Sequence, residues 1–219
     1  MKKSIFFAAG FAALAMLFVA CDDGDSKKPG SEPPAPPPVI PGWEKVLKID
    51  TDPEAFVAGT QNKFQFKITG LSYPEGSTIS FYFVPCKDFD GSVCFRDSGA
   101  DVKMVNSAVP TEIGQTVETG ATGTVTKTDA NWYYVEMKAA AAGTQLGFTW
   151  YKTALPLGED VVYLKGFKVS YIDSDTDEPS EYEYTLEDFT FDAETNPTPC
   201  KIEPYYSVEG LRVTEVDSF

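Results

Sequence analysis

Polar and apolar residues alternate strictly along Lys63–Thr69, and this alternation constrains the fold more than any other feature of the sequence. A period of two places Phe64, Phe66 and Ile68 on one face of a β-strand and leaves the other face to water. Ser77–Val84 repeats the pattern. Further strands are expected at Val46–Ile49, Thr122–Lys127, Trp132–Lys138, Gln145–Tyr151, Val161–Ile172, Glu181–Phe191 and Leu211–Val216. We therefore predict a domain built almost wholly from β-strands.

The alternation changes phase within two of the long predicted strands, near Gly166 and near Glu187. A β-bulge adds one residue to a strand and bends it, as strands require where they curve or change sheets. Ala139–Ala142 suggests a helix, which Gly143 would end early. These features predict an all-β fold, an antiparallel β-sandwich of two sheets, with a β-barrel as the alternative.

The N-terminus has the parts of a secretory signal peptide, a basic start at Met1–Lys3 and an apolar run at Ile5–Ala20. This run is shorter than the ~20 residues that a helix needs to cross a bilayer. Leu17–Cys21 resembles the lipobox of bacterial lipoproteins, although Phe18 stands where that pattern usually has a smaller aliphatic residue. The resemblance implies that the Cys21 thiol is acylated and becomes the mature N-terminus. The alternative is an ordinary cleaved signal with an unrelated cysteine.

Three aspartates follow Cys21 within five residues. In some Gram-negative families such a start resembles a signal for retention in the inner membrane, and in others it resembles an export tag to the cell surface. The long spacer that follows favours the outer membrane and surface exposure. In either case the lipid attaches the protein to a membrane, because each buried methylene contributes roughly 0.8 kcal/mol.

Residues 21–42 are rich in proline and have the composition of a tether. Proline fixes φ and removes backbone donors, so we expect an extended, solvated segment. At ~3.1 Å per residue it would hold a domain on the order of 60 Å from the lipid; a disordered linker without a spacing role is the alternative. The predicted organisation is a signal peptide at 1–20, the tether at 21–42 and one β-sandwich domain at 43–219.

The chain has a formal charge of −15 and contains no histidine. An anionic surface repels phosphate backbones, which argues against nucleic acid as a partner. Without imidazole there is no Ser-His-Asp or Cys-His nucleophile pair and no His-ligated zinc. A glycoside hydrolase needs only two acids placed across a sugar bond, so this class of enzyme is kept as a hypothesis for the function, third after two kinds of binding protein. No spaced carboxylate motif of a hydrolase family is present, and we expect a protein without catalytic activity.

Five segments together resemble the strands of jelly-roll carbohydrate-binding modules in their aromatic-rich alternation. They are Lys63–Gly70, Thr78–Phe83, Asn131–Lys138, Gln145–Trp150 and Val162–Ser170. The resemblance covers most of the domain and implies a jelly-roll-like sandwich that binds a neutral polysaccharide or surface glycan. Because a fold does not determine a function, the alternative is an envelope structural protein or adhesin that binds a protein partner.

The strand at Trp132–Lys138 is the strongest candidate for a glycan site. If its odd-numbered positions face the core, its even-numbered side chains lie together on the solvent side. An aromatic ring there can stack on the C–H face of a sugar while a carboxylate or amide bonds the hydroxyls. The next strand would extend this platform. The predicted ligand-binding residues are Trp132, Tyr134, Glu136, Gln145 and Tyr151. The alternative is the inverted phase, with Trp132 and Tyr134 in the core.

The remaining cysteines suit an oxidising compartment. Cys86 and Cys94 flank a short acidic loop. We predict a disulfide between them, which would contribute roughly 2 to 3 kcal/mol by closing the loop. Cys200 is left without an assigned partner.

Asp173, Asp175 and Asp177 are spaced like the start of a calcium-binding loop. Glu178 stands where an EF-hand loop requires glycine. A structural calcium ion is one hypothesis for this segment, and a solvated acidic loop is the other. No other cofactor is expected.

Overall fold

A computed structural model describes residues 40, 43–52, 57–58, 61–97, 102–119, 122–155, 160–189, 200–205 and 208–217. Contacts divide the chain into two units, residues 1–34 and 35–219, and every described residue belongs to the second unit. The predicted signal peptide, Cys21 and most of the tether lie outside the described residues. Within the described ranges, no helix has the length and apolar character to cross a membrane.

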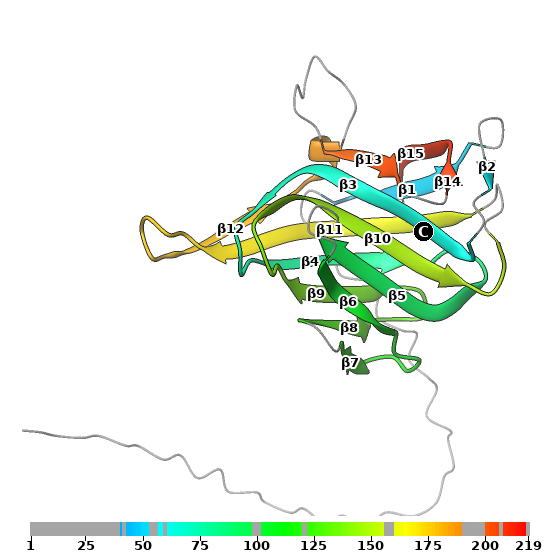
Figure 1. Ribbon diagram of the computed structural model, residues 1–219, viewed down its shortest axis with the longest axis horizontal. Coiled ribbons are helices and arrows are strands. Elements are labelled where there is room, and N and C mark those ends of the chain that lie inside the picture. Colours follow the sequence, from blue (N-terminus) through cyan, green and yellow to red (C-terminus); the bar gives the residue numbers. More distant parts are fainter. Residues whose placement is uncertain are drawn as a thin grey trace, which may run out of the picture. The chain divides into compact units, whose positions relative to one another are not determined.

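The described strands form two antiparallel sheets that pack face to face and do not close into a barrel (Figure 1). The larger, eight-stranded sheet contains β1 (Val46–Thr51), β4 (Thr78–Val84), β7 (Thr116–Glu118), β8 (Gly123–Lys127), β9 (Tyr133–Lys138), β11 (Val161–Ile172), β12 (Pro179–Glu183) and β15 (Leu211–Val216). The five-stranded sheet contains β3 (Lys63–Tyr73), β5 (Phe89–Asp97), β6 (Val102–Ala108), β10 (Gly143–Lys152) and β13 (Lys201–Pro204). A small third pair joins β2 (Val57–Ala58) to β14 (Val208–Glu209), and η1 (Leu186–Phe189) is a 3₁₀ turn.

The strand order is that of a jelly roll. In the eight-stranded sheet β1, β11, β4 and β9 are neighbours in that order, and in the five-stranded sheet the order is β3, β10, β5 and β6. Successive strands therefore pass repeatedly from one sheet to the other, as in double-sheet jelly rolls. The predicted sandwich is confirmed, and the alternative of a barrel is wrong.

Aromatic side chains dominate the core between the two sheets. Phe64, Phe66 and Ile68 are fully buried, as their alternation predicts. Phe81 of β4 meets Phe148 of β10 edge-to-face across the sandwich, with ring centroids 5.3 Å apart. Such pairs contribute about 0.5–1.5 kcal/mol beyond the burial of their area. These contacts fix the two sheets against each other, which determines what their outer faces present.

The predicted bulge near Gly166 is confirmed. The pairing of β11 with β4 shifts register between Lys165 and Lys168, and Gly166 has a φ of 64°. A Cβ at this glycine would lie 2.7 Å from Cδ1 of Ile40 and 3.2 Å from Cδ2 of Tyr82. Both the backbone conformation and the close packing therefore require glycine here.

Two other expectations for local structure are wrong. The phase change near Glu187 is not a bulge, because β12 ends at Glu183 and the chain turns into η1. Ala139–Ala142 is not helical and instead forms the connection from β9 to β10. This connection passes from one sheet to the other, and local alternation carries no signal for such a crossing.

The predicted disulfide between Cys86 and Cys94 is wrong, since both side chains are buried thiols. Most of the residues between Cys86 and Cys94, which were expected to form a loop closed by the disulfide, belong to β5. In this strand Val93 and Phe95 point into the core. Cys94 lies between them and must point to the opposite face of the strand. Cys86 belongs to the core. The two sulfur atoms therefore lie on opposite sides of the five-stranded sheet.

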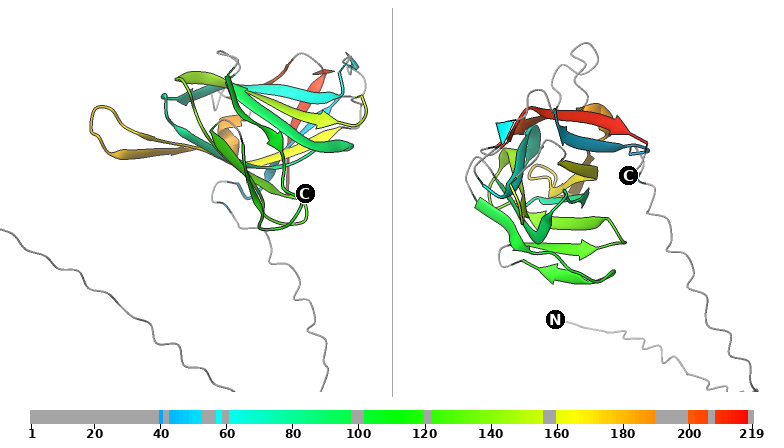
Figure 2. Two further views of the ribbon diagram at one scale, coloured as in Figure 1. Left: turned by 60° about the horizontal axis from the view of Figure 1, so that its bottom comes forward. Right: turned by 90° about the vertical axis from the view of Figure 1, so that its right-hand side faces the viewer.

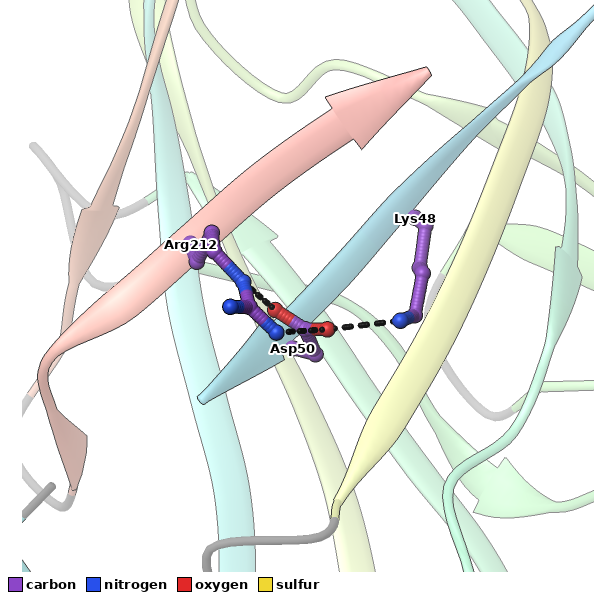
Figure 3. A network of polar contacts seen from close by, with 3 residues as sticks. All are labelled: Lys48, Asp50 and Arg212. Atoms are coloured by element: carbon purple, nitrogen blue, oxygen red, sulfur yellow. Dashed lines mark hydrogen bonds and ion pairs between the residues drawn. The ribbon is translucent and has the colours of Figure 1, made fainter. Parts of the chain in front are cut away.

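The last strand, β15, is held to β1 by a three-residue polar network on the outer face of the eight-stranded sheet (Figure 3). Arg212 donates from Nε and one terminal nitrogen to the two carboxylate oxygens of Asp50, at 2.8 and 2.9 Å. Lys48 lies 2.8 Å from the same carboxylate. Burial raises the pKa of Asp50, but the hydrogen bonds from Arg212 and Lys48 outweigh it and hold that pKa below its usual value.

Candidate functional site

The outer face of the eight-stranded sheet carries the predicted aromatic residues of β9. Tyr133, Val135 and Met137 belong to the core. Tyr134 and Glu136 therefore point outward, with Tyr134 half-buried and Glu136 exposed. The predicted phase of this strand is confirmed, and the alternative with Tyr134 in the core is wrong.

Trp132 lies on the same outer face but is not open to a ligand. Its side chain is only 5 % exposed and packs in a small cluster with Val46 and Val84. Nζ of Lys165 lies 4.2 Å from the centroid of its ring and covers it. The expectation of an exposed Trp132 is therefore wrong, because its neighbours on the sheet surface bury it.

A pair of tyrosines stands beside this cluster at a small pocket. The rings of Tyr82 on β4 and Tyr134 on β9 have centroids 4.8 Å apart and planes tilted by 47°. The two residues are direct cross-strand neighbours, as the pairing of β4 with β9 shows. With Ser80, Lys168 and Glu183 they line a pocket of about 180 Å³. We call this the tyrosine-pair pocket.

Tyr82 is not among the predicted ligand-binding residues, although the alternation of Ser77–Val84 contains the necessary signal. Phe81 and Phe83 point inward, so Tyr82 points outward by parity. What the sequence alone lacked was the pairing of β4 with β9, which places Tyr82 opposite Tyr134.

The polar groups around the tyrosine-pair pocket make two side-chain contacts. The Tyr134 hydroxyl donates to Glu136 at 3.4 Å, and Lys168 lies 2.7 Å from a carboxylate oxygen of Glu181. The hydrogen bond with Glu181 raises the pKa of Lys168, so its ammonium group is charged at neutral pH. Burial, with a smaller effect of Tyr134, raises the pKa of Tyr82 and keeps its phenol neutral. The pocket thus offers neutral aromatic rings beside charged hydrogen-bonding groups.

Gln145 and Tyr151 do not extend this pocket. They lie on β10, which belongs to the five-stranded sheet, and alternate with core residues that include Trp150. Their side chains therefore point outward from the other side of the sandwich, where Lys63 lies over the ring of Tyr151 at 5.3 Å. The five predicted ligand-binding residues are thus divided between two opposite faces of the domain, and the expected single platform is wrong.

A second hollow on the eight-stranded sheet brings two glutamates near each other. Glu118 of β7 and Glu136 of β9 flank Thr124 of β8, which is paired with each of them. These residues contribute to a pocket of about 260 Å³. Two strand spacings separate the glutamate backbones by roughly 10 Å. Glu136 lines this pocket, and its carboxylate also accepts the hydrogen bond from the Tyr134 hydroxyl.

The acidic segment between β11 and β12 forms a tight turn. Oδ1 of Asp173 accepts hydrogen bonds from the backbone nitrogens of Asp175 and Thr176, at 2.8 and 3.2 Å. Asp177 adopts a positive φ of 57°. Among the described residues, no three His, Cys, Asp or Glu side chains gather in a way that could hold a metal ion. Asp173, Asp175 and Asp177 are therefore not brought together into such a group.

Comparisons with known proteins gave no match to a protein-family model, to a curated protein or to a solved structure.

Proposed function

We propose that this protein is a lipid-anchored protein of the bacterial cell surface that binds a neutral glycan without cleaving it. The lipobox-like segment that ends at Cys21 supports the anchor, and the acidic, proline-rich segment after it supports display at the outer membrane. The observation that carries the glycan proposal is the pairing of Tyr82 with Tyr134 at a pocket whose rim holds Lys168 and Glu183.

The chemistry of the tyrosine-pair pocket suits a sugar. A pyranose ring presents C–H groups to an aromatic face and hydroxyl groups to its sides. Charged groups make stronger hydrogen bonds to hydroxyls than neutral groups do. Lys168 donates and Glu183 accepts, so that both functions of a sugar hydroxyl find a partner. The formal charge of −15 disfavours anionic polysaccharides and leaves neutral ones.

A glycan array tests this proposal with the chain from residue 22 onward. The wild-type chain is expected to bind neutral glycans, and Tyr134→Ala is expected to weaken binding about tenfold, equivalent to roughly 1.4 kcal/mol. Tyr151→Ala is the matched control, since it removes a half-buried tyrosine from the opposite sheet. Absence of binding to every neutral glycan, or equal binding by Tyr134→Ala, would overturn the proposal.

A glycoside hydrolase is the second candidate function, favoured by the pocket of Glu118 and Glu136. Inverting glycosidases place two carboxyl groups about 6.5–9.5 Å apart, a range that two glutamates separated by one intervening strand, β8, can provide. Release of reducing sugar from a neutral glycan, abolished by Glu136→Gln and by Glu118→Gln, would establish catalysis. Binding without release supports the proposal made above.

A protein partner remains the outcome to expect if glycans fail. In that case the tyrosine-pair pocket would be buried against the partner, and crosslinking in cells would recover one protein in constant ratio to this chain. Tyr134→Ala would then weaken the crosslink, whereas Tyr151→Ala would not.

A further inference from the structure

A larger cleft opens at one end of the sandwich, on the inner side of the β11–β12 hairpin. This hairpin projects beyond the body of the sandwich (Figures 1 and 2). The cleft has a volume of about 530 Å³. Its lining includes Ser72, Tyr171, Tyr182, Tyr184, Asp188 and Cys200.

Tyr182 presents its ring to this cleft in a fixed orientation. The side chain is 49 % exposed, yet its ring meets that of Tyr184 edge-to-face with centroids 4.6 Å apart. Its hydroxyl donates to Oδ1 of Asp188 at 3.1 Å. Oδ2 of Asp188 accepts from the backbone nitrogen of Thr185 at 2.7 Å. The ring contact with Tyr184 and the hydrogen bond to Asp188 hold the exposed ring of Tyr182 in place. The ring therefore loses little conformational entropy when a ligand stacks on it.

The floor of the cleft is equally rigid. Tyr184 is buried, and its hydroxyl accepts a hydrogen bond from the backbone nitrogen of Ser72 on β3 at 2.9 Å. This bond ties the hairpin to the five-stranded sheet. Burial raises the pKa of Tyr184 and that of Cys200 to about 12, so that both groups are neutral. Cys200 therefore offers no thiolate for nucleophilic chemistry.

The lining of the cleft selects the class of ligand. It contains three tyrosines and one carboxylate, and none of its described residues is a lysine or arginine. An anionic ligand would meet Asp188 with no compensating cation. A neutral, polyhydroxylated ligand stacks on Tyr182 and donates hydroxyl hydrogens to Asp188.

The cleft and the tyrosine-pair pocket lie on the two faces of the same strand. Glu183 lines the pocket, and its neighbour Tyr182 lines the cleft. Adjacent residues of a strand point to opposite faces, so only the thickness of β12 separates the two sites. β12 pairs with β11, and no other described strand lies along its second edge.

We propose that the cleft at Tyr182 is a second carbohydrate-binding site, and that one neutral glycan chain passes the edge of β12 to contact both sites. The inference rests on the proposed glycan-binding function. Two linked sites bind a long chain more tightly than either binds alone, because the second contact is intramolecular. Short oligosaccharides contact one site at a time and gain nothing from the other.

Calorimetric titration of the chain from residue 22 onward tests the inference. The probes are β-1,4-linked glucose, xylose and mannose oligosaccharides of about two and about eight units, lengths chosen to contact one site or both. Tyr182→Ala is expected to weaken binding of the long probe roughly tenfold or more while the tyrosine-pair pocket still binds the short one. Tyr182→Phe keeps the ring, loses the bond to Asp188 and is expected to show a smaller loss. Tyr151→Ala, on the opposite sheet, is the matched control.

The outcomes separate the two proposals. Equal binding of the long probe by wild type and Tyr182→Ala overturns the second site and leaves the first. Binding that survives Tyr82→Ala/Tyr134→Ala and disappears when Tyr182→Ala is added supports the cleft and overturns the tyrosine-pair pocket. Absence of binding by the wild-type chain to every probe overturns both.

Discussion

Nζ of Lys165 lies 4.2 Å from the centroid of the Trp132 ring, on the outer face of the eight-stranded sheet. Both residues are buried, at 7 % and 5 % exposure. Burial lowers the pKa of Lys165, with a smaller opposing effect of Asp129. A cation over an indole face contributes about 0.5–2 kcal/mol when partly desolvated. Lys165 also lies 5.7 Å from the centroid of the Tyr82 ring, so the pair packs against one of the residues that line the tyrosine-pair pocket.

Lys165→Met keeps most of the aliphatic length and removes the cation. We expect the free energy of unfolding to fall by about 0.5–2 kcal/mol, measured by urea denaturation. Lys168→Met is the control, because it removes a half-exposed ion pair with Glu181, a type worth at most about 1 kcal/mol. A Lys165→Met chain as stable as wild type would show that the contact with Trp132 contributes nothing.

Sequence alternation predicts which way a side chain points but not what covers it. Lys63–Thr69 and the bulge at Gly166 were predictable, because both are recorded in the local order of polar and apolar residues. The burial of Trp132 was not predictable, since the side chain that covers its ring, Lys165, comes from another strand. The phase change near Glu187 was ambiguous, because a 3₁₀ turn and a bulge both interrupt a period of two.

The predicted single binding platform was wrong in part because the sequence near each strand does not show which strands pair. Tyr134 and Tyr151 stand on strands that follow one another in the chain, which suggested one continuous surface. The connection at Ala139–Ala142 crosses between the sheets instead. The packing of the whole core determines which strands pair. The resulting pairing places Tyr134 and Tyr151 on opposite sides of the domain.

The Asp50 network makes stability depend on pH in a defined direction. The pKa of Asp50 is held below 3.8 in the folded state, so its contribution is complete above about pH 4 and is lost as pH falls through the folded pKa. We expect wild type to exceed Asp50→Asn in unfolding free energy at pH 6 to 7, roughly neutral conditions, and the difference to shrink below about pH 4. A difference that stays constant down to about pH 2 would contradict the ion pairing with Arg212.

The glycine at the bulge has a matched control elsewhere in the chain. Gly166 and Gly76 both have positive φ, 64° and 79°, but only Gly166 has close neighbours at the position of a Cβ. Gly76→Ala is expected to cost about 1 kcal/mol for the backbone conformation alone. Gly166→Ala is expected to cost more, by a further 1–3 kcal/mol or so, because the added methyl meets Ile40 and Tyr82. Equal losses in urea denaturation would show that the bulge is loosely packed.

The cysteines provide a test of the buried positions of Cys86 and Cys200 and of the separation of Cys86 from Cys94. In the native chain from residue 22 onward, we expect Cys86 and Cys200 to resist alkylation, because burial raises the pKa of each thiol to about 12. Denaturation should make them react at once, which mass spectrometry of alkylated peptides detects. A peptide pair joined by a disulfide between Cys86 and Cys94, in protein isolated without reductant, would contradict their placement on opposite sides of the sheet.

The central claim is that the tyrosine-pair pocket holds an uncharged sugar by stacking and hydrogen bonds. Calorimetric titration with the neutral oligosaccharide best retained on the array, at low and at high salt, tests it most directly. The account predicts an affinity that changes little with salt, because the ligand carries no charge, and that falls by at least about tenfold in Tyr82→Ala/Tyr134→Ala. An affinity that the double substitution leaves unchanged, or that collapses as salt rises, would contradict it.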